Sequence, residues 1–469
     1  MSPPQAGTPI LGGAPRPQCE RPQLSILRPS ALNSLFSYSS LFPAALAALR
    51  AAIYFFPPAP RAASPHFVQR LWLPMEGLNK CVLRFKSGFC HVACFAPLAS
   101  FYRPVYNLYY CKIRGDILRT EILEVNQESL DRAGTIIREG GLVAFPTETV
   151  YGLGADALCP DAVKKIFEAK GRPGDNPLIV HIASAETLHE IVREIPPEAE
   201  LLLKRFTPGP LTLVLKRNAN IPDEVTAGLD TVGVRIPFHP AARAFINAAG
   251  RPIAAPSANR SGSPSPTTAQ HVLADLEGKV EIILDGGPCS VGVESTVLSL
   301  AGSVPMLLRP GGVTLEQLKS VLPDIQVHKS VLNQGMVDKA ASPGMKYKHY
   351  SPSARVVIAK ELETARRVYN KAAQEGVNTW LLASDTQIKA MPETDSTVLY
   401  SQQHPEQAAQ RLFALLREAD VLGKELVVVV WDNQEGLGLS VTNRLLRASA
   451  FTVLSGHGEI DACGRKIVY

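Results

Sequence analysis

The sequence of 469 residues lacks the short motifs that mark several large enzyme classes. It contains no G-x-x-x-x-G-K-[ST] phosphate loop, and no G-x-G-x-x-G segment that opens a helix after a strand. H-E-x-x-H, paired C-x-x-C and G-x-S-x-G motifs are also missing. These absences argue against P-loop nucleoside triphosphatases, dinucleotide-binding dehydrogenases, zinc peptidases and serine hydrolases. Any chemistry would therefore rest on positioning and charge stabilisation rather than on a protein nucleophile.

Cysteine is scarce beyond the first quarter of the chain. Residues 116–469 hold three scattered cysteines, which give no disulfide framework and indicate a reducing compartment. Cys90 and Cys94 have one histidine between them, and no second pair of ligands lies at a spacing that suits zinc. We therefore expect no metal held by protein ligands, and a cytoplasmic location.

Acidic residues are nearly absent from residues 1–115. This segment carries 12 Lys and Arg against Glu20 and Glu76, whereas the rest of the chain carries 36 Lys and Arg against 41 Asp and Glu. The segment shows no sustained helix or strand period, and its apolar run over 44–56 is too short to span a bilayer. We expect an N-terminal extension that is either disordered, an organellar transit segment, or the result of a translation start assigned too far upstream. No membrane association is expected.

From about Arg119 onward, short apolar strands alternate with amphipathic helices, which is typical of α/β or α+β domains. Asp161 is expected to cap a helix that follows the first strand and loop. We predict a domain over residues 116–321. Its strands are expected at 142–145, 177–182, 211–215, 233–236, 253–255, 280–284, 295–300 and 306–308, and further helices at 199–206, 241–249 and 268–276.

Residues 322–354 show no convincing period and contain several glycines and prolines, so they are expected to form a linker or a lid. Beyond them, short apolar strands again alternate with helices, a pattern that predicts a small parallel-sheet domain over residues 355–469. Its strands are expected at 356–358, 379–382 and 426–431, and its helices at 361–373 and 406–419.

Small, hydroxyl-bearing and basic residues gather in four loops, at residues 146–154, 170–177, 255–265 and 294–296, the last followed across a hairpin by 309–312. Such loops can bind anionic ligands through hydroxyl, amide and basic groups. Each feature also has a structural explanation. Lys170 and Arg172 could form a solvated helix end, His181 could be packed in the core, and Arg309 could form a surface ion pair worth about 1 kcal/mol or less.

These loops carry a resemblance to a known family. The segments PTETVYGLG, AKGRPGDNPLIVHI, PGPLTLVL, VGVRIP, APSANRSGSPSPT, GVESTV, RPG and SPGMKYKHYSP occur in this order. Together they resemble the YrdC-like threonylcarbamoyl-AMP synthases. The segment SPGMKYKHYSP, with GLGLSVTNRLLRA further on, is similar to the long, two-domain form. The resemblance covers residues 119–469 and leaves residues 1–115 unexplained.

The resemblance implies an α/β fold with an open, twisted mixed sheet and a concave cleft, followed by a small Rossmann-like C-terminal domain whose linker closes over the cleft. It implies an enzyme that converts L-threonine, bicarbonate and ATP into threonylcarbamoyl-AMP and pyrophosphate. Mg²⁺ would bridge the phosphates, and its other ligands would be mostly water. A downstream transferase would then use the product to modify the adenosine beside the tRNA anticodon.

The resemblance also implies roles for individual residues. The threonine side comprises Thr149, His181, Arg235, Ala255 and Ser295. The nucleotide side comprises Lys170, Arg172, Asn176, Thr231, Ser257, Asn259, Ser265, Arg309 and Tyr347, with Tyr347 in the lid.

Two other functions remain open at this point. The same concave surface could bind RNA in a ribosome-maturation factor, but the acidic balance of residues 116–469 and the placement of most aromatics in apolar runs disfavour stable nucleic-acid binding. A carbamoyl-adenylate module for hydrogenase maturation would be accompanied by acylphosphatase and zinc-finger segments, which the chain lacks.

Overall fold

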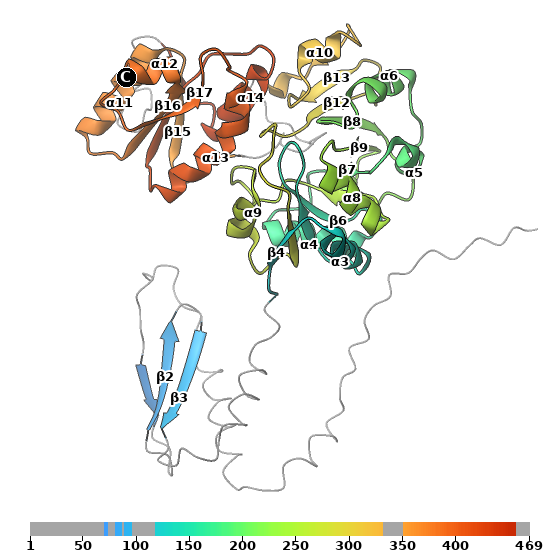
Figure 1. The fold of residues 1–469 in the computed structure, drawn as a ribbon, viewed down its shortest axis with the longest axis horizontal. Coiled ribbons are helices and arrows are strands. Elements are labelled where there is room, and N and C mark those ends of the chain that lie inside the picture. The colour runs from blue at the N-terminus through green and yellow to red at the C-terminus, as the bar shows by residue number, and fades with distance from the viewer. Residues whose placement is uncertain (1–69, 74–79, 87–88, 96–117, 332–349, 456–469) are drawn as a thin grey trace, which may run out of the picture. The chain divides into compact units, whose positions relative to one another are not determined.

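The computed structural model describes residues 70–73, 80–86, 89–95, 118–331 and 350–455 (Figure 1). The chain divides into two compact units, Met1–Asp116 and Ile117–Tyr469, and each is described by itself.

The first unit contains an antiparallel sheet of β1 (Arg70–Leu73), β2 (Lys80–Lys86) and β3 (Phe89–Phe95). The sequence analysis predicts no element here, so these strands are a difference from expectation. Their sequences contain several aromatic residues, and only Ser87 and Gly88 separate β2 from β3, which is a spacing typical of hairpins. The other residues of the expected N-terminal extension lie outside the described ranges.

The second unit begins with an eleven-stranded mixed sheet in the order β14-β13-β12-β8-β9-β7-β10-β6-β5-β11-β4. This arrangement confirms the expected fold class. The strands are β4 (Glu121–Glu124), β5 (Val143–Phe145), β6 (Gly152–Asp156), β7 (Ile179–His181), β8 (Leu211–Lys216), β9 (Thr231–Arg235), β10 (Ile253–Ala255), β11 (Ile282–Asp285), β12 (Thr296–Ser299), β13 (Met306–Arg309) and β14 (Gln326–Val327).

Helices connect these strands. The helices are α3 (Gln127–Arg138), α4 (Pro160–Lys170), α5 (Leu188–Ile191), α6 (Pro197–Phe206), α7 (Asp223–Thr226), α8 (Pro240–Ala249), α9 (Ala269–Leu276) and α10 (Leu315–Lys319). Short 3-10 turns lie at Ala185–Thr187 and Lys329–Val331. Helix α4 begins at Pro160, with Cys159 as its N-cap, so the expectation that Asp161 caps it is wrong. Proline is tolerated at the first helical position because an N–H group there would have no hydrogen-bond partner within the helix. Asp161 lies in the first turn of the helix and does not cap it.

Strand β6 was expected to be part of a loop because it contains two glycines. It is fully buried and pairs with β5 and β10, and a Cβ on Gly154 would lie 2.7 Å from Cγ2 of Ile253. The glycine therefore allows the close approach of β10 and does not mark a turn.

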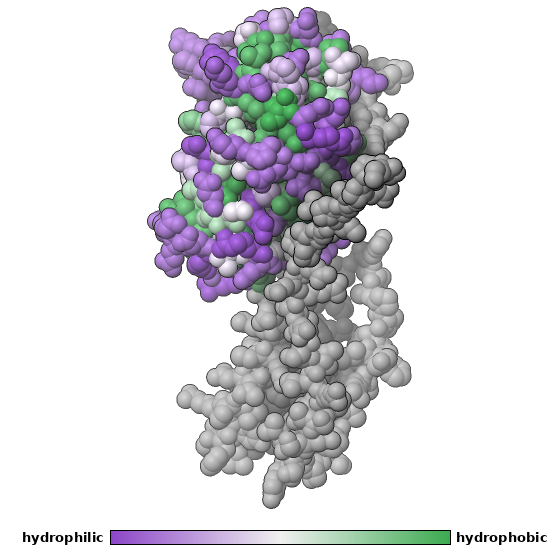
Figure 2. All heavy atoms as spheres, turned by 90° about the vertical axis from the view of Figure 1, so that its right-hand side faces the viewer, coloured by the Kyte–Doolittle hydropathy of each residue, from purple (hydrophilic) through white to green (hydrophobic). Residues whose placement is uncertain are grey.

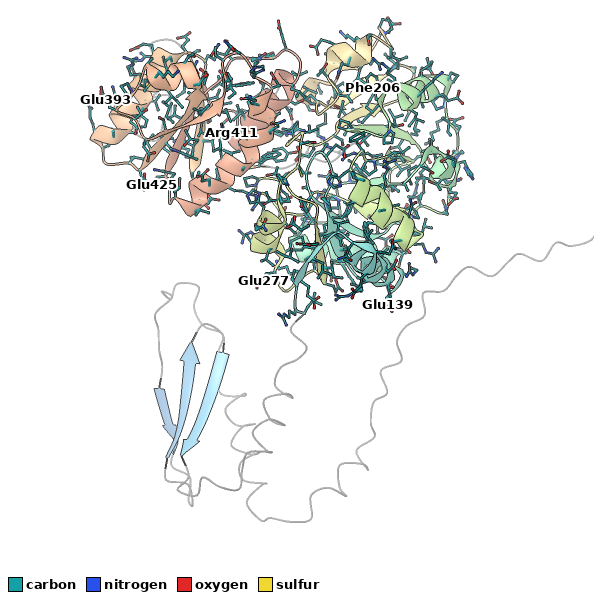
Figure 3. The ribbon with its side chains drawn as sticks, viewed as in Figure 1. Glu139, Phe206, Glu277, Glu393, Arg411 and Glu425 are labelled. Carbon is teal, nitrogen blue, oxygen red and sulfur yellow. The ribbon has the colours of Figure 1, made fainter. Side chains whose placement is uncertain are left out.

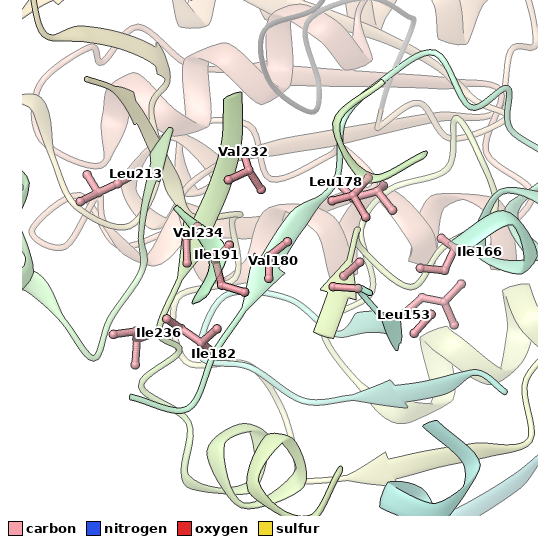
Figure 4. Close-up of a cluster of buried hydrophobic side chains, with 14 of the residues drawn as sticks. Leu153, Ile166, Leu178, Val180, Ile182, Ile191, Leu213, Val232, Val234 and Ile236 are labelled. Carbon is pink, nitrogen blue, oxygen red and sulfur yellow. The ribbon is translucent and has the colours of Figure 1, made fainter. Parts of the chain in front are cut away.

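The main hydrophobic core is built from strands and helices along much of this sheet (Figure 4). Its members are aliphatic side chains that alternate along the strands, as one buried face of a sheet requires. They include Leu153, Ile166, Leu178, Val180, Ile182, Ile191, Leu213, Val232, Val234 and Ile236.

The C-terminal part of the second unit has an all-parallel sheet in the order β17-β16-β18-β15-β19, which confirms the predicted parallel arrangement. Its elements are β15 (Arg355–Ala359), α11 (Leu362–Gln374), β16 (Thr379–Ser384), α12 (Asp385–Lys389), β17 (Ser396–Tyr400), α13 (Gln407–Val421), β18 (Leu426–Val430), α14 (Gly438–Ala448) and β19 (Val453–Leu454). The sequence analysis missed β17, β19, α12 and α14.

The segment expected to be a linker does not begin as one. Strand β14 lies within residues 322–354, yet it pairs with β13 and thus extends the large sheet. Residues 332–349, and Tyr347 with them, lie outside the described ranges.

One face of the described part of the chain is largely polar (Figure 2). On the face seen in Figure 2, hydrophilic residues cover most of the described surface, with hydrophobic areas among them. Exposed carboxylates such as Glu139, Glu277, Glu393 and Glu425 lie on the outside of the folded part (Figure 3). Among the described residues, no helix combines the length and apolarity that crossing a membrane requires.

The contact between α3 and α8 gives a test of the packing. A Cβ on Gly134 would lie 2.5 Å from the carbonyl oxygen of Ala248, a backbone atom that has little room to move. We expect Gly134→Ala to lower the free energy of unfolding by about 1–3 kcal/mol, because this overpacking outweighs the gain in helix propensity. The control is Thr135→Ala, at an exposed position of the same helix. Equal urea midpoints for the two variants would contradict the close packing.

Candidate functional site

Polar residues from several strand ends and loops line one cavity of the second unit. Its wall includes most of the residues predicted for the two sides of the site. These are Thr149, His181, Arg235, Ala255 and Ser295 from the threonine side, and Lys170, Arg172, Ser257, Asn259 and Arg309 from the nucleotide side.

Three further predicted residues, Asn176, Thr231 and Ser265, do not belong to the cavity wall, and Tyr347 lies outside the described residues. Asn176 and Ser265 are buried directly behind wall residues: the carbonyl of Asn176 accepts a hydrogen bond from Arg172, and the hydroxyl of Ser265 donates one to Glu294. Thr231 begins β9, whereas Arg235 ends it, so the two lie roughly 13 Å apart along the strand.

Arg235 is held from several directions at the end of β9. Its Nη2 lies 2.7 Å from Oε1 of Glu148, its Nη1 donates to Oγ1 of Thr149 at 2.9 Å, and its Nε donates to the carbonyl of Gly209 at 3.3 Å. Burial acts to raise the pKa of Glu148, but the charge of Arg235 and its hydrogen bond lower it below the ordinary value. The pair is therefore ionised, and it fixes a guanidinium group in the cavity wall where a carboxylate can bind.

His181 lies in β7, next to Arg235 on the paired strand β9. Its Nδ1 lies 3.2 Å from the carbonyl oxygen of Ile179, and its ring packs edge-on against Phe145. Burial, and then the charge of Arg235, lower the pKa of His181 to about 3. The imidazole is consequently neutral near pH 7, and it can contribute a hydrogen bond but no positive charge.

Lys170 differs from its expected role as a cation that faces phosphate. Its Nζ donates to the carbonyls of Ser257 and Asn259, at 2.5 and 2.6 Å, and lies 3.4 Å from Oδ1 of Asn259. Burial lowers the pKa of this lysine well below its ordinary value. In this structure the Nζ atom of Lys170 therefore fixes the loop of residues 257–259, which in turn forms part of the cavity wall.

Arg172 and Arg309 bring positive charge to the same cavity. Arg309 is buried at the end of β13, and its Nε and Nη2 donate to the carbonyl and the hydroxyl of Ser295, both at 3.1 Å. Arg172 lies just beyond α4 and donates to the carbonyl of Asn176 at 3.2 Å. Guanidinium groups held in this way suit the recognition of phosphate.

Glu294 is the acidic residue of the cavity wall. Its Oε1 accepts a hydrogen bond from the hydroxyl of Ser265 at 2.5 Å, and its Oε2 accepts one from Nε of Arg444 at 2.7 Å. Burial acts to raise the pKa of Glu294, but Arg444 and then Arg309 outweigh this effect and lower it to about 2. The site thus includes a carboxylate that is ionised near neutral pH and has a partner from the C-terminal domain.

Comparison with known proteins identifies the family of this chain. Residues 135–311 match the Sua5–YciO–YrdC family, described as "Telomere recombination", and residues 313–450 match the family "Threonylcarbamoyl-AMP synthase, C-terminal domain". The chain is 49% identical over 327 residues to the threonylcarbamoyl-AMP synthase of Pyrococcus abyssi, an alignment that covers 69% of this chain and 94% of the relative. The chain belongs to the threonylcarbamoyl-AMP synthase family.

Further relatives agree with this assignment to the synthase family. The threonylcarbamoyl-AMP synthase of Bacillus subtilis is 45% identical over 338 residues, which cover 71% of this chain and 97% of that protein. The crystal structure of P. abyssi Sua5 complexed with L-threonine superposes with a TM-score of 0.68 at 47% identity, covering 72% of this chain and 99% of that one. The resemblance to the long, two-domain form of the synthase family is thereby confirmed.

The sequence analysis missed several residues of this synthase site. Thr147 and Tyr350 line the cavity, and Glu148 pairs with Arg235. Glu148 and Glu294 lie within quoted family segments, and a carboxylate in a run of buried residues is a signal for a buried ion pair.

Arg444 was also missed, although its position in the sequence carries a signal. Val441, Arg444, Leu445 and Ala448 follow helical spacing on one buried face of α14. A charged residue among apolar ones on such a face requires a buried partner of opposite charge, and the partner is Glu294, 150 residues away in the sequence.

The low pKa of His181 predicts how stability depends on pH. Its pKa falls from an ordinary value of 6.5 to about 3 on folding, so the unfolded chain binds more protons between these pH values. The free energy of unfolding should fall as the pH drops through this window, by up to about 1.4 kcal/mol per pH unit from this group. His181→Gln should make the pH dependence of the urea midpoint shallower.

The matched control is His189→Gln, which changes an exposed histidine of α5. The slope of stability against pH of the His181→Gln protein is compared with the slope of this variant. His271, whose pKa burial lowers to about 4, supplies part of the slope that remains. A His181→Gln protein with the same slope as the native protein would show that His181 is not held neutral by the fold.

Proposed function

We propose that this protein is a threonylcarbamoyl-AMP synthase, which converts L-threonine, bicarbonate and ATP into threonylcarbamoyl-AMP and pyrophosphate for the modification of tRNA. The observation that carries the proposal is the single cavity that brings Arg235 and Thr149 together with Arg172 and Arg309 in a chain of this family. The relative solved with L-threonine supports threonine as the amino-acid substrate.

On the threonine side, the substrate carboxylate is proposed to bind the guanidinium of Arg235. Thr149 and Ser295 offer hydroxyl groups beside it, and neutral His181 offers a ring nitrogen. Ala255, at the end of β10, forms the apolar part of this wall. Glu148 holds the guanidinium of Arg235 in place, and the hydroxyl and imidazole groups beside it can add hydrogen bonds to the carboxylate without adding charge.

On the nucleotide side, Arg172 and Arg309 are proposed to meet the phosphates, and Ser257 and Asn259 the nucleoside, on a loop that Lys170 fixes. We further propose that Asn176, Thr231, Ser265 and Tyr347 belong to this side, with Asn176 and Ser265 acting through the wall residues that they hold.

The proposed reaction needs positioning and charge rather than a protein nucleophile. An oxygen of the threonine carbamate attacks the α-phosphorus of ATP, the bond from that phosphorus to the bridging oxygen breaks, and pyrophosphate leaves with the electron pair. Arg172 and Arg309 spread the charge that develops on the phosphates. Among the described residues no group of acidic, His or Cys side chains could hold a metal. Mg²⁺ is therefore proposed to arrive as part of MgATP, with phosphate and water ligands.

The wider proposals follow from this activity. The product is proposed to pass to a downstream tRNA-modifying transferase. Residues 116–321 are proposed to form the synthase domain, 322–354 the linker, whose first part adds β14 to the large sheet, and 355–469 the C-terminal domain, with residues 1–115 as an extension. The proposed location is the cytoplasm, or an organelle if the extension is a transit segment. Nothing in the part of the chain that the structure describes favours the RNA-binding alternative.

The direct test is the release of pyrophosphate by the purified protein with MgATP and bicarbonate, with and without L-threonine. We expect release only when threonine is present, together with a product whose mass is that of threonylcarbamoyl-AMP. Release that does not depend on threonine, or AMP as the sole product, would refute the proposal.

Arg172 offers a test of the charge argument. Arg172→Ala should lower threonine-dependent pyrophosphate release by about a hundredfold or more, since it removes one preorganised charge donor. Arg193→Ala is the control because Arg193 is exposed and pairs with Asp230 at the surface. Near-normal turnover of Arg172→Ala, at saturating and at low ATP, would contradict the role of Arg172.

A further inference from the structure

Helix α14 of the C-terminal domain contacts residues of the synthase domain, among them Glu294 of the cavity wall. It lies on the side of its domain that faces β12 and β13 (Figure 1), and the hydroxyl of Ser440 donates to the carbonyl of Gly311 at 2.9 Å. From the same helix, Arg444 donates to Oε2 of Glu294 at 2.7 Å and to the carbonyl of Pro310 at 2.9 Å. The side chain of Arg444 is completely buried, and that of Glu294 is 7% exposed.

The carboxylate of Glu294 poses a difficulty for a cavity that must accept a polyphosphate. It lines the same wall as Arg309, the residue that the proposed function assigns to the phosphates. An unpaired carboxylate there would repel the triphosphate and would compete with it for Arg309, and both effects are strong where water is largely excluded. The charge of Glu294 must therefore be compensated by a group other than Arg309.

Arg444 is the group that meets this requirement. The two oxygens of Glu294 are taken up by Arg444 and Ser265, while the Nε and Nη2 atoms of Arg309 donate to Ser295. The guanidinium of Arg444 also lies 5.6 Å from the ring centroid of Tyr350, a further residue of the cavity wall. Its place is thus fixed by contacts on several sides.

We propose that Arg444 is a positioning residue, by which the C-terminal domain neutralises Glu294 and prevents this carboxylate from competing with the phosphates of ATP for Arg309. This inference rests on the proposed function. It gives the C-terminal domain a specific electrostatic task in ATP binding and predicts that threonine binding is largely independent of Arg444.

Attachment of the two domains does not by itself explain this pair. Arg417 of α13 already joins them, with Nη2 at 2.7 Å from Oδ2 of Asp275 in α9. Glu294, in contrast, lines the ligand cavity. An ion pair that served only to join the two domains would not need a partner in the wall of that cavity. Replacement of both charges by neutral groups of similar volume should therefore preserve the fold.

The test uses the full chain and measures the binding of MgATP and of L-threonine separately, by calorimetry. Arg444→Met should weaken ATP binding by about tenfold or more, and should change threonine binding by less than about threefold. Adding Glu294→Gln should restore ATP binding to within about threefold of the native protein, because no carboxylate is left to be neutralised. Arg447→Met is the control on the same helix, since Arg447 contacts the carbonyl of Ser330 and should leave ATP binding unchanged.

Several results would overturn the proposal. The first is that Arg444→Met binds ATP as tightly as the native protein. The second is that Arg444→Met loses as much affinity for threonine as for ATP. The third is that the double variant binds ATP as weakly as Arg444→Met. If Arg444→Met does not fold, Arg444→Met/Glu294→Gln and Arg444→Lys decide the matter. Both should bind ATP within about threefold of the native protein, and a loss beyond tenfold in the folded double variant overturns the proposal.

The same measurements separate this inference from the proposed function. If the native protein binds MgATP but forms no threonylcarbamoyl-AMP, the proposed function fails. The role of Arg444 is then still decided by the ATP affinities of the variants. If the native protein forms the product and the variants bind ATP as it does, only the inference about Arg444 fails.

Discussion

The burial of several cationic side chains around one cavity is the constraint on which the rest of the site depends. Isolated charges are strongly disfavoured away from water, so each cation needs a partner. Arg235 pairs with Glu148, Arg444 pairs with Glu294, and Lys170 is surrounded by backbone carbonyls. The wall is therefore rigid before any ligand enters, as preorganised electrostatic stabilisation requires.

The fold supplies these partners from distant parts of the sequence. Glu148 follows β5 and Arg235 ends β9, so the pair forms only after the strands between them have been assembled. Glu294 and Arg444 come from different domains. Assembly of the sheet, docking of α14 and formation of the site are thus coupled, since an unmatched charge would otherwise remain in the wall.

Much of the fold could be predicted from local patterns. Apolar runs located most of the strands, because a buried strand shows its character over a few residues, as the strand at 253–255 does. Strand β6 was missed because glycines that allow close strand contact resemble those of a turn. Strand β14 was missed because its two residues are exposed and depend on pairing with β13.

The predicted site residues came from family segments, and the structure brings most of them to one cavity. The partners of these residues could not be predicted in the same way. A sequence shows that Glu294 is charged and that Arg444 lies on an apolar helix face, but their contact is a property of the assembled fold. The same is true of Lys170, whose ammonium group is directed to the loop of residues 257–259.

The most direct test of the central claim is a crystal structure of the protein with L-threonine and a non-hydrolysable ATP analogue. The account predicts both ligands in the one cavity, with the threonine carboxylate on Arg235 and the phosphates beside Arg172 and Arg309. Ligands in separate cavities, or phosphates remote from both of these arginines, would contradict it.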